Sequence, residues 1–142
     1  MKKVLIVDKI HSDLKNNLTK EGIICKEKTS ESKDKILKSI HKFDGLIIRS
    51  RFKLDKYFIN KASNLKFIAR FGSGMENIDL IEAKKNQIKC INAPTGNSNS
   101  VSEHTLGLLL SLTKKIQLSS LEVNNGKWIR EQNRGIEISN KT

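Results

Sequence analysis

Val4-Leu5-Ile6-Val7, near the start of the chain, is the first of five short apolar runs that decide the fold. Each run is rich in β-branched or other apolar residues and is only three or four residues long, so each is predicted to be a strand. Helix-like segments separate the runs, and this alternation favours a parallel sheet joined by crossover helices. The later runs are residues 23–25, 46–48, 67–69 and 88–91, and all except 23–25 are predicted to be central and well buried.

Capping residues mark where the intervening helices begin. Polar side chains that can accept a hydrogen bond from a helix N-terminus precede several apolar stripes. Ser12 with Asp13 is predicted to cap the first helix, which ends at Gly22, and Ser32 is predicted to cap the second. The third helix is predicted to start at Leu54-Asp55, and the fourth spans residues 77–86. The sequence therefore predicts an α/β domain with a flavodoxin-like parallel five-stranded sheet and helices on both faces.

A change of character follows the only proline, Pro94, which cannot continue a strand or a helix. We predict one domain over residues 1–94 and a second segment over residues 95–142. Ser100 is predicted to open a long helix in the second segment, with Glu103 completing a capping box. Residues 106–112 are apolar around most of the helix, so we expect them to pack against a neighbouring domain or a second copy of the chain.

The formal net charge of +12 on 142 residues does not predict nucleic-acid binding, because the lysines are spread among acidic residues. The run from Val4 to Val7 is too short for a signal peptide or a membrane span, so we expect a cytoplasmic protein without a membrane partner. Cys25 and Cys90 lack metal-binding spacing and are interpreted as buried thiols, and no metal site is predicted.

Two loops are candidates for chemistry, because ligands of such sheets bind beyond the carboxyl ends of the strands. Arg49-Ser50-Arg51 follows the third apolar run. Two guanidinium groups flanking a hydroxyl suit an anionic substrate, and an ordinary loop with salt bridges is the alternative.

The second loop, Arg70 to Asn77, contains Gly72-Ser73-Gly74. These residues are half of a dinucleotide-binding fingerprint, but Asn77 replaces the third glycine, and no acidic residue ends the next strand. We therefore reject a pyrophosphate loop here. Backbone amides that hold a carboxylate are the favoured interpretation, and a plain tight turn is the alternative.

In this order, the motifs resemble the front portion of the D-2-hydroxyacid dehydrogenases. They are Arg49-Ser50-Arg51, the R-x-G-x-G-x-x-N-I-D pattern of residues 70–79, Asn92-Ala93-Pro94, and residues 97–104 with Glu103-His104. The resemblance implies a flavodoxin-like substrate domain, a Rossmann domain that binds NAD, an active site between them, and a dimer. The reaction would transfer a hydride between NAD and a small-molecule 2-hydroxy acid.

The resemblance also implies roles for single residues. The backbone amides of Ser73 and Gly74 would hold the substrate carboxylate, and Ser73 would also face the cofactor. Asn97 would contact substrate, Val101 would lie near the nicotinamide, and Arg49, Ser50 and Arg51 would bind the anionic end of the substrate. His104 matches the family motif without being its acid/base histidine.

The resemblance places the family's nucleotide loop, acidic ribose ligand and catalytic arginine, glutamate and histidine beyond the position of Thr142. We therefore predict no catalytic residue within this chain and expect a truncated, inactive polypeptide that self-associates through the helix over residues 100–115. The alternative is a non-catalytic interaction or regulatory module with the same layered fold. A phospho-receiver module is disfavoured, because Arg49 and Asn92 stand where it needs an aspartate and a lysine.

Overall fold

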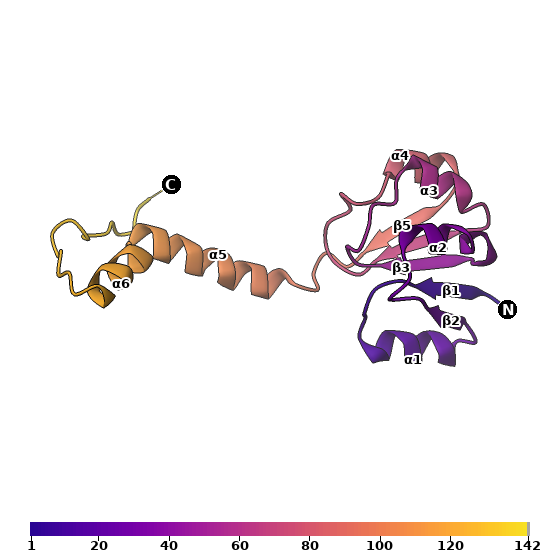
Figure 1. The fold of residues 1–142 in the computed structure, drawn as a ribbon, viewed down its shortest axis with the longest axis horizontal. Coiled ribbons are helices and arrows are strands. Elements are labelled where there is room, and N and C mark those ends of the chain that lie inside the picture. Colours follow the sequence, from indigo (N-terminus) through magenta and orange to yellow (C-terminus); the bar gives the residue numbers. More distant parts are fainter. Residues whose placement is uncertain (142) are drawn as a thin grey trace. The chain divides into compact units, whose positions relative to one another are not determined.

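The computed structural model describes residues 1–141, which form two compact units, Met1–Gly96 and the residues from Asn97 onward (Figure 1). The first unit contains five strands and the helices that connect them. In chain order its elements are β1 (Lys3–Ile6), α1 (Ser12–Lys20), β2 (Ile24–Glu27), α2 (Lys33–Leu37), the 3-10 helix η1 (Ile40–Lys42), β3 (Gly45–Ile48), α3 (Lys56–Lys61), β4 (Phe67–Arg70), α4 (Leu80–Lys85) and β5 (Lys89–Asn92).

The strands form one parallel sheet in the order β2-β1-β3-β4-β5. This is the flavodoxin-like order, and the predicted fold class is confirmed. The prediction that the last apolar run is central was wrong. β5 is an edge strand, and the side chain of Ile91 is 44% exposed. Strand order depends on crossover directions that the hydrophobicity of a short run does not encode.

Helices cover both faces of the sheet, as predicted (Figure 1). Alternate residues of β1 point to opposite faces, because side chains of a strand alternate. Leu5 packs with α2, α3 and α4 in the larger core cluster, and Ile6 packs with Leu14 and Leu18 of α1 in the smaller one. The central strand β3 is buried along its whole length.

The helix caps agree with the sequence in part. Ser32 caps α2 and Asp55 caps α3, as predicted. The cap predicted at Ser12 was wrong, because the side chain of His11 accepts from the Asp13 N–H at 3.4 Å, one residue earlier. α4 is shorter than predicted, since Asp79 caps it by accepting from the Glu82 N–H at 2.9 Å.

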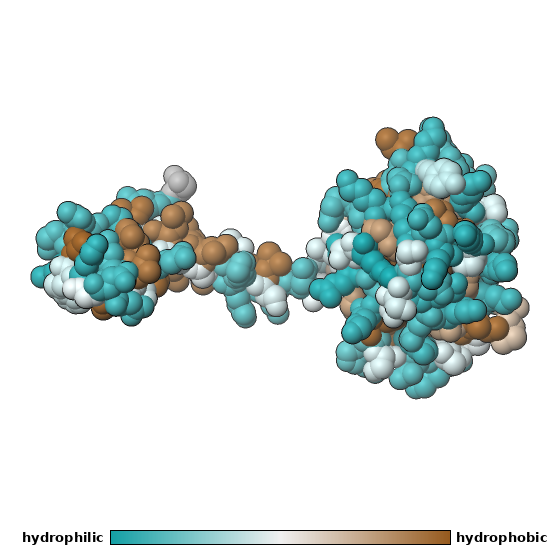
Figure 2. All heavy atoms as spheres, viewed as in Figure 1, coloured by the Kyte–Doolittle hydropathy of each residue, from teal (hydrophilic) through white to brown (hydrophobic). Residues whose placement is uncertain are grey.

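The second unit contains the helices α5 (Ser98–Thr113) and α6 (Ile116–Asn124). The predicted capping box at Ser100 was wrong, because α5 begins two residues earlier and Ser100 lies inside it. Neither helix buries a residue. Figure 2 shows apolar side chains gathered over these helices. Within residues 1–141, no helix is long and apolar enough to cross a membrane.

Candidate functional site

The carboxyl ends of the parallel strands place several polar loops at one edge of the sheet. Asp8 follows β1, Arg49 follows β3, the glycine loop (Gly72–Gly74) follows β4, and Asn92 ends β5. β3, β4 and β5 are neighbours in the sheet, so the loops that follow them lie at adjacent positions along this edge. The structure therefore brings together the two candidate loops predicted from the sequence.

Neighbouring strands fix the glycine loop through its backbone. The Phe71 N–H donates to the carbonyl oxygen of Ile48 at 2.7 Å. On the other side, the Ala93 N–H donates to the Gly72 carbonyl oxygen at 2.9 Å, and Asn92 Nδ2 donates to the Ser73 carbonyl oxygen at 2.5 Å. The loop is therefore tied to β3 on one side and to the end of β5 on the other.

Both glycines of the loop lie directly beneath a charged side chain. A Cβ at Gly72 would overlap the guanidinium of Arg70, and a Cβ at Gly74 would overlap the carboxylate of Glu76. A residue with a Cβ at either position would therefore move the charged side chain above it.

Arg70 is the site residue that the sequence reasoning missed. Its side chain is 13% exposed, and its Nη2 lies 3.7 Å from Oε1 of Glu76. Within the described part of the chain, Arg70 Nε is buried without a hydrogen-bond partner, as is Oδ1 of Asn77. A buried N–H without a partner is uncommon. The signal available in the sequence was an arginine at the last position of a buried strand.

Arg51 has a structural role that the sequence did not predict. Its Nη1 donates to the carbonyl oxygens of Val7 at 2.7 Å and Lys28 at 2.9 Å, and its Nη2 donates to that of Glu31 at 2.5 Å. The guanidinium thus links the ends of β1 and β2 to the loop before α2. The substrate role of Arg51 stays a prediction, but these donors already bind three carbonyl oxygens.

Arg49 and Ser50 are exposed at the same edge. Their loop is held by Asp8, whose Oδ2 accepts from the backbone N–H of Arg49 at 2.6 Å and that of Arg51 at 3.4 Å. Asn77 Nδ2 donates to the carbonyl oxygen of Arg49 at 3.5 Å, which connects this loop to the segment after the glycine loop. The substrate role of Arg49 and Ser50 stays a prediction.

Asn97 and Val101 belong to the second unit. Asn97 is the N-cap residue of α5, its side chain makes no capping hydrogen bond, and its carbonyl oxygen accepts from the Val101 N–H at 2.9 Å. Val101 is 52% exposed. Both side chains are thus on the surface of this unit, and their predicted contacts with substrate and nicotinamide stay predictions.

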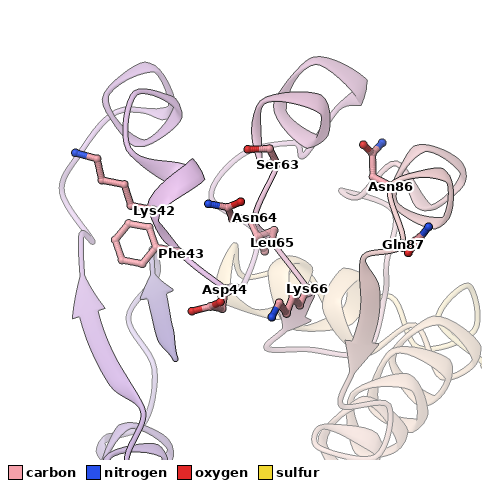
Figure 3. A pocket seen from close by; sticks show the side chains of 9 residues that line it. All are labelled: Lys42, Phe43, Asp44, Ser63, Asn64, Leu65, Lys66, Asn86 and Gln87. Carbon is pink, nitrogen blue, oxygen red and sulfur yellow. The ribbon is translucent and has the colours of Figure 1, made fainter. Parts of the chain in front are cut away.

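A polar pocket lies at the opposite edge of the sheet, beside the amino ends of β3, β4 and β5 (Figure 3). Its lining includes Lys42, Asp44, Lys66, Asn86 and Gln87. Lys42 extends away from Asp44 and Lys66 in Figure 3, so the charged groups do not converge on one point. This pocket is on the wrong edge for the predicted site and contributes no residue to it.

Other reactive groups do not add to the site. Burial raises the pKa of the Cys90 thiol, which disfavours the thiolate form. Among residues 1–141, no group of three or more histidine, cysteine, aspartate or glutamate side chains is arranged to hold a metal ion. The carboxyl edge thus offers backbone amides and arginine side chains that can bind an anion, beside the carboxylates of Asp8 and Glu76.

Comparison with known proteins identifies the class of domain. The model of the catalytic domain of the D-isomer specific 2-hydroxyacid dehydrogenases matches residues 4–133. The chain therefore belongs to the D-2-hydroxyacid dehydrogenase family, whose members are oxidoreductases. The resemblance inferred from the sequence motifs is confirmed.

The most similar relatives include D-3-phosphoglycerate dehydrogenases. That of Archaeoglobus fulgidus is 36% identical over 140 residues, which is 99% of this chain and 27% of the relative. The human protein of the same name is 34% identical over 142 residues, again 27% of its length. The chain thus spans about a quarter of the length of these relatives.

Solved structures give the same fold. A protein from Pyrococcus horikoshii OT3 superposes with a TM-score of 0.80 at 27% identity, over 92% of this chain and 39% of that one. The 3-phosphoglycerate dehydrogenase of Entamoeba histolytica, solved with NAD+ bound, has a TM-score of 0.66 at 27% identity, over 80% of this chain and 40% of that one.

Proposed function

We propose that this chain is the substrate-binding portion of an NAD-dependent D-2-hydroxyacid dehydrogenase of the phosphoglycerate dehydrogenase type. The observation that carries the proposal is the glycine loop (Gly72–Gly74), held by the neighbouring strands beneath the guanidinium of Arg70. The similarity to D-3-phosphoglycerate dehydrogenases over the whole chain supports the same assignment.

In this proposal the N–H groups of Ser73 and Gly74 bind the carboxylate of the 2-hydroxy acid. Successive backbone amides in a loop form an anion-binding concavity without needing a charged side chain. The guanidinium of Arg70 adds positive charge directly above the loop.

Arg49 is exposed and follows Ile48, whose carbonyl oxygen accepts from the Phe71 N–H next to the glycine loop. Arg49 would bind a second anionic group such as a phosphate. Ser50 would supply a hydroxyl to the same group. We assign a smaller direct part to Arg51, because its donors already bind three carbonyl oxygens. Asn97 would also contact the substrate.

The glycine loop fits a substrate carboxylate better than a cofactor pyrophosphate. Asn77 stands at the third glycine position, α4 begins only at Leu80, and β5 ends at Asn92 rather than at an acidic residue. We propose that Ser73 and Val101 touch NAD at its nicotinamide end, while its main binding surface lies outside the 142 residues. The cofactor, when bound, would accept or return the hydride of the carbon that carries the hydroxyl.

By itself, the 142-residue chain is proposed to orient a 2-hydroxy acid without oxidising it. Hydroxyl oxidation needs a group that takes the hydroxyl proton. The groups to which we assign substrate binding at the carboxyl edge are backbone amides and arginines, which bind anions and accept no proton at neutral pH.

Self-association through α5 is a second proposal, and it rests on the second unit. Leu106, Leu108, Leu109 and Leu112 of α5 are 51%, 59%, 43% and 79% exposed. Such a concentration of exposed leucine on one helix is typical of a protein interface rather than of a solvated surface. We propose that a second copy of this chain, or of the whole enzyme, covers this helix.

Isothermal titration of the chain with D-3-phosphoglycerate and D-lactate tests the carboxylate site. Ser73→Pro removes one of the two proposed N–H donors, and Ser73→Ala keeps that donor while removing the hydroxyl. We expect measurable binding by the unmodified chain and by Ser73→Ala, with a loss of about tenfold or more in Ser73→Pro. Equal affinity of Ser73→Pro and Ser73→Ala for both ligands would remove the basis of the proposal.

A further inference from the structure

We propose that Asn92 is a positioning residue that aims the amides of the glycine loop (Gly72–Gly74) at the substrate anion. The inference deepens the proposed function and rests on it, because it concerns how the same site is built. Asn92 lies at the last position of β5, and its side-chain Nδ2 donates to the Ser73 carbonyl oxygen at 2.5 Å.

The geometry of the peptide unit couples each carbonyl oxygen to the N–H that follows it. A trans peptide is planar, and its C=O and N–H bonds point in opposite directions. All peptide bonds of the described residues are trans. A contact that fixes the carbonyl oxygen of one residue therefore fixes, in the opposite direction, the N–H of the next residue.

Two such contacts act on successive peptide units of the loop. The Gly72 carbonyl oxygen accepts from the Ala93 N–H at 2.9 Å, which directs the Ser73 N–H away from Ala93. The Ser73 carbonyl oxygen accepts from Asn92 Nδ2, which directs the Gly74 N–H away from Asn92. Both donors come from the end of β5, so the two N–H groups are turned to the same side.

The two contacts differ in how easily they are lost. The Ala93 contact is backbone to backbone and continues the pairing of β4 with β5. The Asn92 contact depends on one side chain, and without it the peptide between Ser73 and Gly74 is free to rotate. Rotation would present a carbonyl oxygen to the anion in place of an N–H group, which replaces attraction by repulsion.

The contact with Ser73 requires a hydrogen-bond donor at position 92, which aspartate lacks. The amide of asparagine donates, whereas a carboxylate only accepts. In Asn92→Asp the carboxylate would face the Ser73 carbonyl oxygen, and the repulsion favours the rotated peptide. Asn92→Ala removes the donor without adding charge, so we expect a smaller loss of anion affinity in Asn92→Ala than in Asn92→Asp.

Asn86 provides a matched control. Its Nδ2 also donates to a main-chain carbonyl oxygen, that of Glu82, at 2.9 Å, and it lines the pocket at the opposite edge of the sheet. Asn86→Asp therefore makes the same chemical change and loses the same kind of hydrogen bond, together with the bond that Asn86 Nδ2 donates to Oδ1 of Asn60 at 3.0 Å. It leaves the glycine loop untouched.

The experiment combines ligand titration with nuclear magnetic resonance of the full chain. D-3-phosphoglycerate is titrated against the unmodified chain, Asn92→Asp, Asn92→Ala and Asn86→Asp. The orientation of the Gly74 N–H is measured by residual dipolar couplings, and the hydrogen bond by scalar coupling from Asn92 Nδ2 to the Ser73 carbonyl carbon. We expect Asn92→Asp to lose about tenfold or more in affinity and to show a reoriented Gly74 N–H, and Asn86→Asp to stay within about twofold.

Two results would overturn the inference. One is a Gly74 N–H whose orientation is the same in Asn92→Asp as in the unmodified chain. The other is the absence of the scalar coupling in the unmodified chain, which needs no variant to fold. If the unmodified chain shows the coupling and binds no 2-hydroxy acid, the proposed function fails while the positioning by Asn92 stands.

Discussion

Arg51 Nη1 donates to the carbonyl oxygen of Val7 at 2.7 Å, so an arginine with the chemistry of a substrate ligand holds the end of β1 in place. The same guanidinium donates to Lys28 and Glu31, in the segment between β2 and α2. Five donors in a rigid fork allow arginine to satisfy three carbonyl oxygens at once, which lysine cannot do with the same geometry.

We therefore predict that Arg51→Lys lowers the free energy of unfolding by about 1–3 kcal/mol, because carbonyl oxygens lose charged donors. Urea denaturation monitored by circular dichroism measures the change. Arg49→Lys is the control, since the structure gives Arg49 no such internal role, and its unfolding midpoint should stay close to that of the unmodified chain. Equal midpoints for the two variants would show that the three Arg51 hydrogen bonds do not stabilise the fold.

Asp55 gives a prediction about pH. Its pKa is lowered from 3.8, first by the hydrogen bond from Lys33 Nζ at 2.5 Å and then by the backbone N–H of Phe58. A group whose folded pKa is depressed stabilises the fold above its unfolded pKa, and this contribution is lost as the pH falls through the folded pKa. Asp55→Asn keeps a capping side chain and removes the charge.

We expect the unmodified chain to be more stable than Asp55→Asn near neutral pH, by less than about 1 kcal/mol because the pair is partly exposed. The difference should shrink as the pH falls and disappear once the carboxyl of the folded chain is protonated, at a lower pH than an ordinary aspartate needs. Chemical denaturation of both proteins across this range measures it. A stability difference that persisted unchanged into acid would show that the Lys33 pair is not its source.

Gly45 and Gly107 have opposite surroundings, so replacing each by alanine tests how closely the first unit and α5 are packed. A Cβ at Gly45 would overlap the ring of Phe67, which packs in the α1-side core, whereas a Cβ at Gly107 meets nothing within 4 Å. We predict that Gly45→Ala destabilises the first unit by about 1–3 kcal/mol. Gly107→Ala should instead increase helix content slightly, because alanine is favoured inside helices by up to about 1 kcal/mol. Circular dichroism with urea denaturation distinguishes the two, and a destabilising Gly107→Ala would indicate that α5 is closely packed at that position.

The exposed leucines of α5 predict self-association. We expect light scattering to show an oligomer at moderate salt, where screening over about 10 Å weakens repulsion between chains of net charge +12. Leu108→Lys combined with Leu109→Glu should give a folded monomer, because it places charges within the exposed apolar surface. A monomeric unmodified chain at both low and moderate salt would refute this prediction.

The fold was predictable because the buried strands have a strong local signal. β1 and β3 are continuous apolar runs, and the crossovers between strands carry capping residues such as Ser32 and Asp55 that act within three residues. The edge position of β5 was not predictable in this way, since it depends on strand order. The start of α5 was not predicted correctly. Its N-cap residue, Asn97, makes no side-chain capping hydrogen bond, so the usual capping signal does not mark the start of this helix.

The sequence predicted where the candidate site lies but not the side-chain contacts within it. The glycine loop was recognised from Gly72 and Gly74, whose spacing is visible in the sequence. The position of Asn92 beside the loop depends on the pairing of β4 with β5, which only the folded sheet creates. The position of Arg70 above Gly72 depends on the conformation of the loop itself. Arg51 shows the reverse case, because its residue type suggested a ligand and the fold uses its donors internally.

Binding of the substrate carboxylate by the amides of Ser73 and Gly74 is tested most directly by titrating the ¹⁵N-labelled chain with D-3-phosphoglycerate and following the amide chemical shifts. We predict saturable shifts centred on the N–H groups of Ser73 and Gly74, with smaller shifts at Arg49 and Arg70. We expect no shifts at Asn86 and Gln87, which lie at the opposite edge of the sheet. Shifts centred on Asn86 and Gln87, or no saturable shift at Ser73 and Gly74 at millimolar ligand, would contradict it.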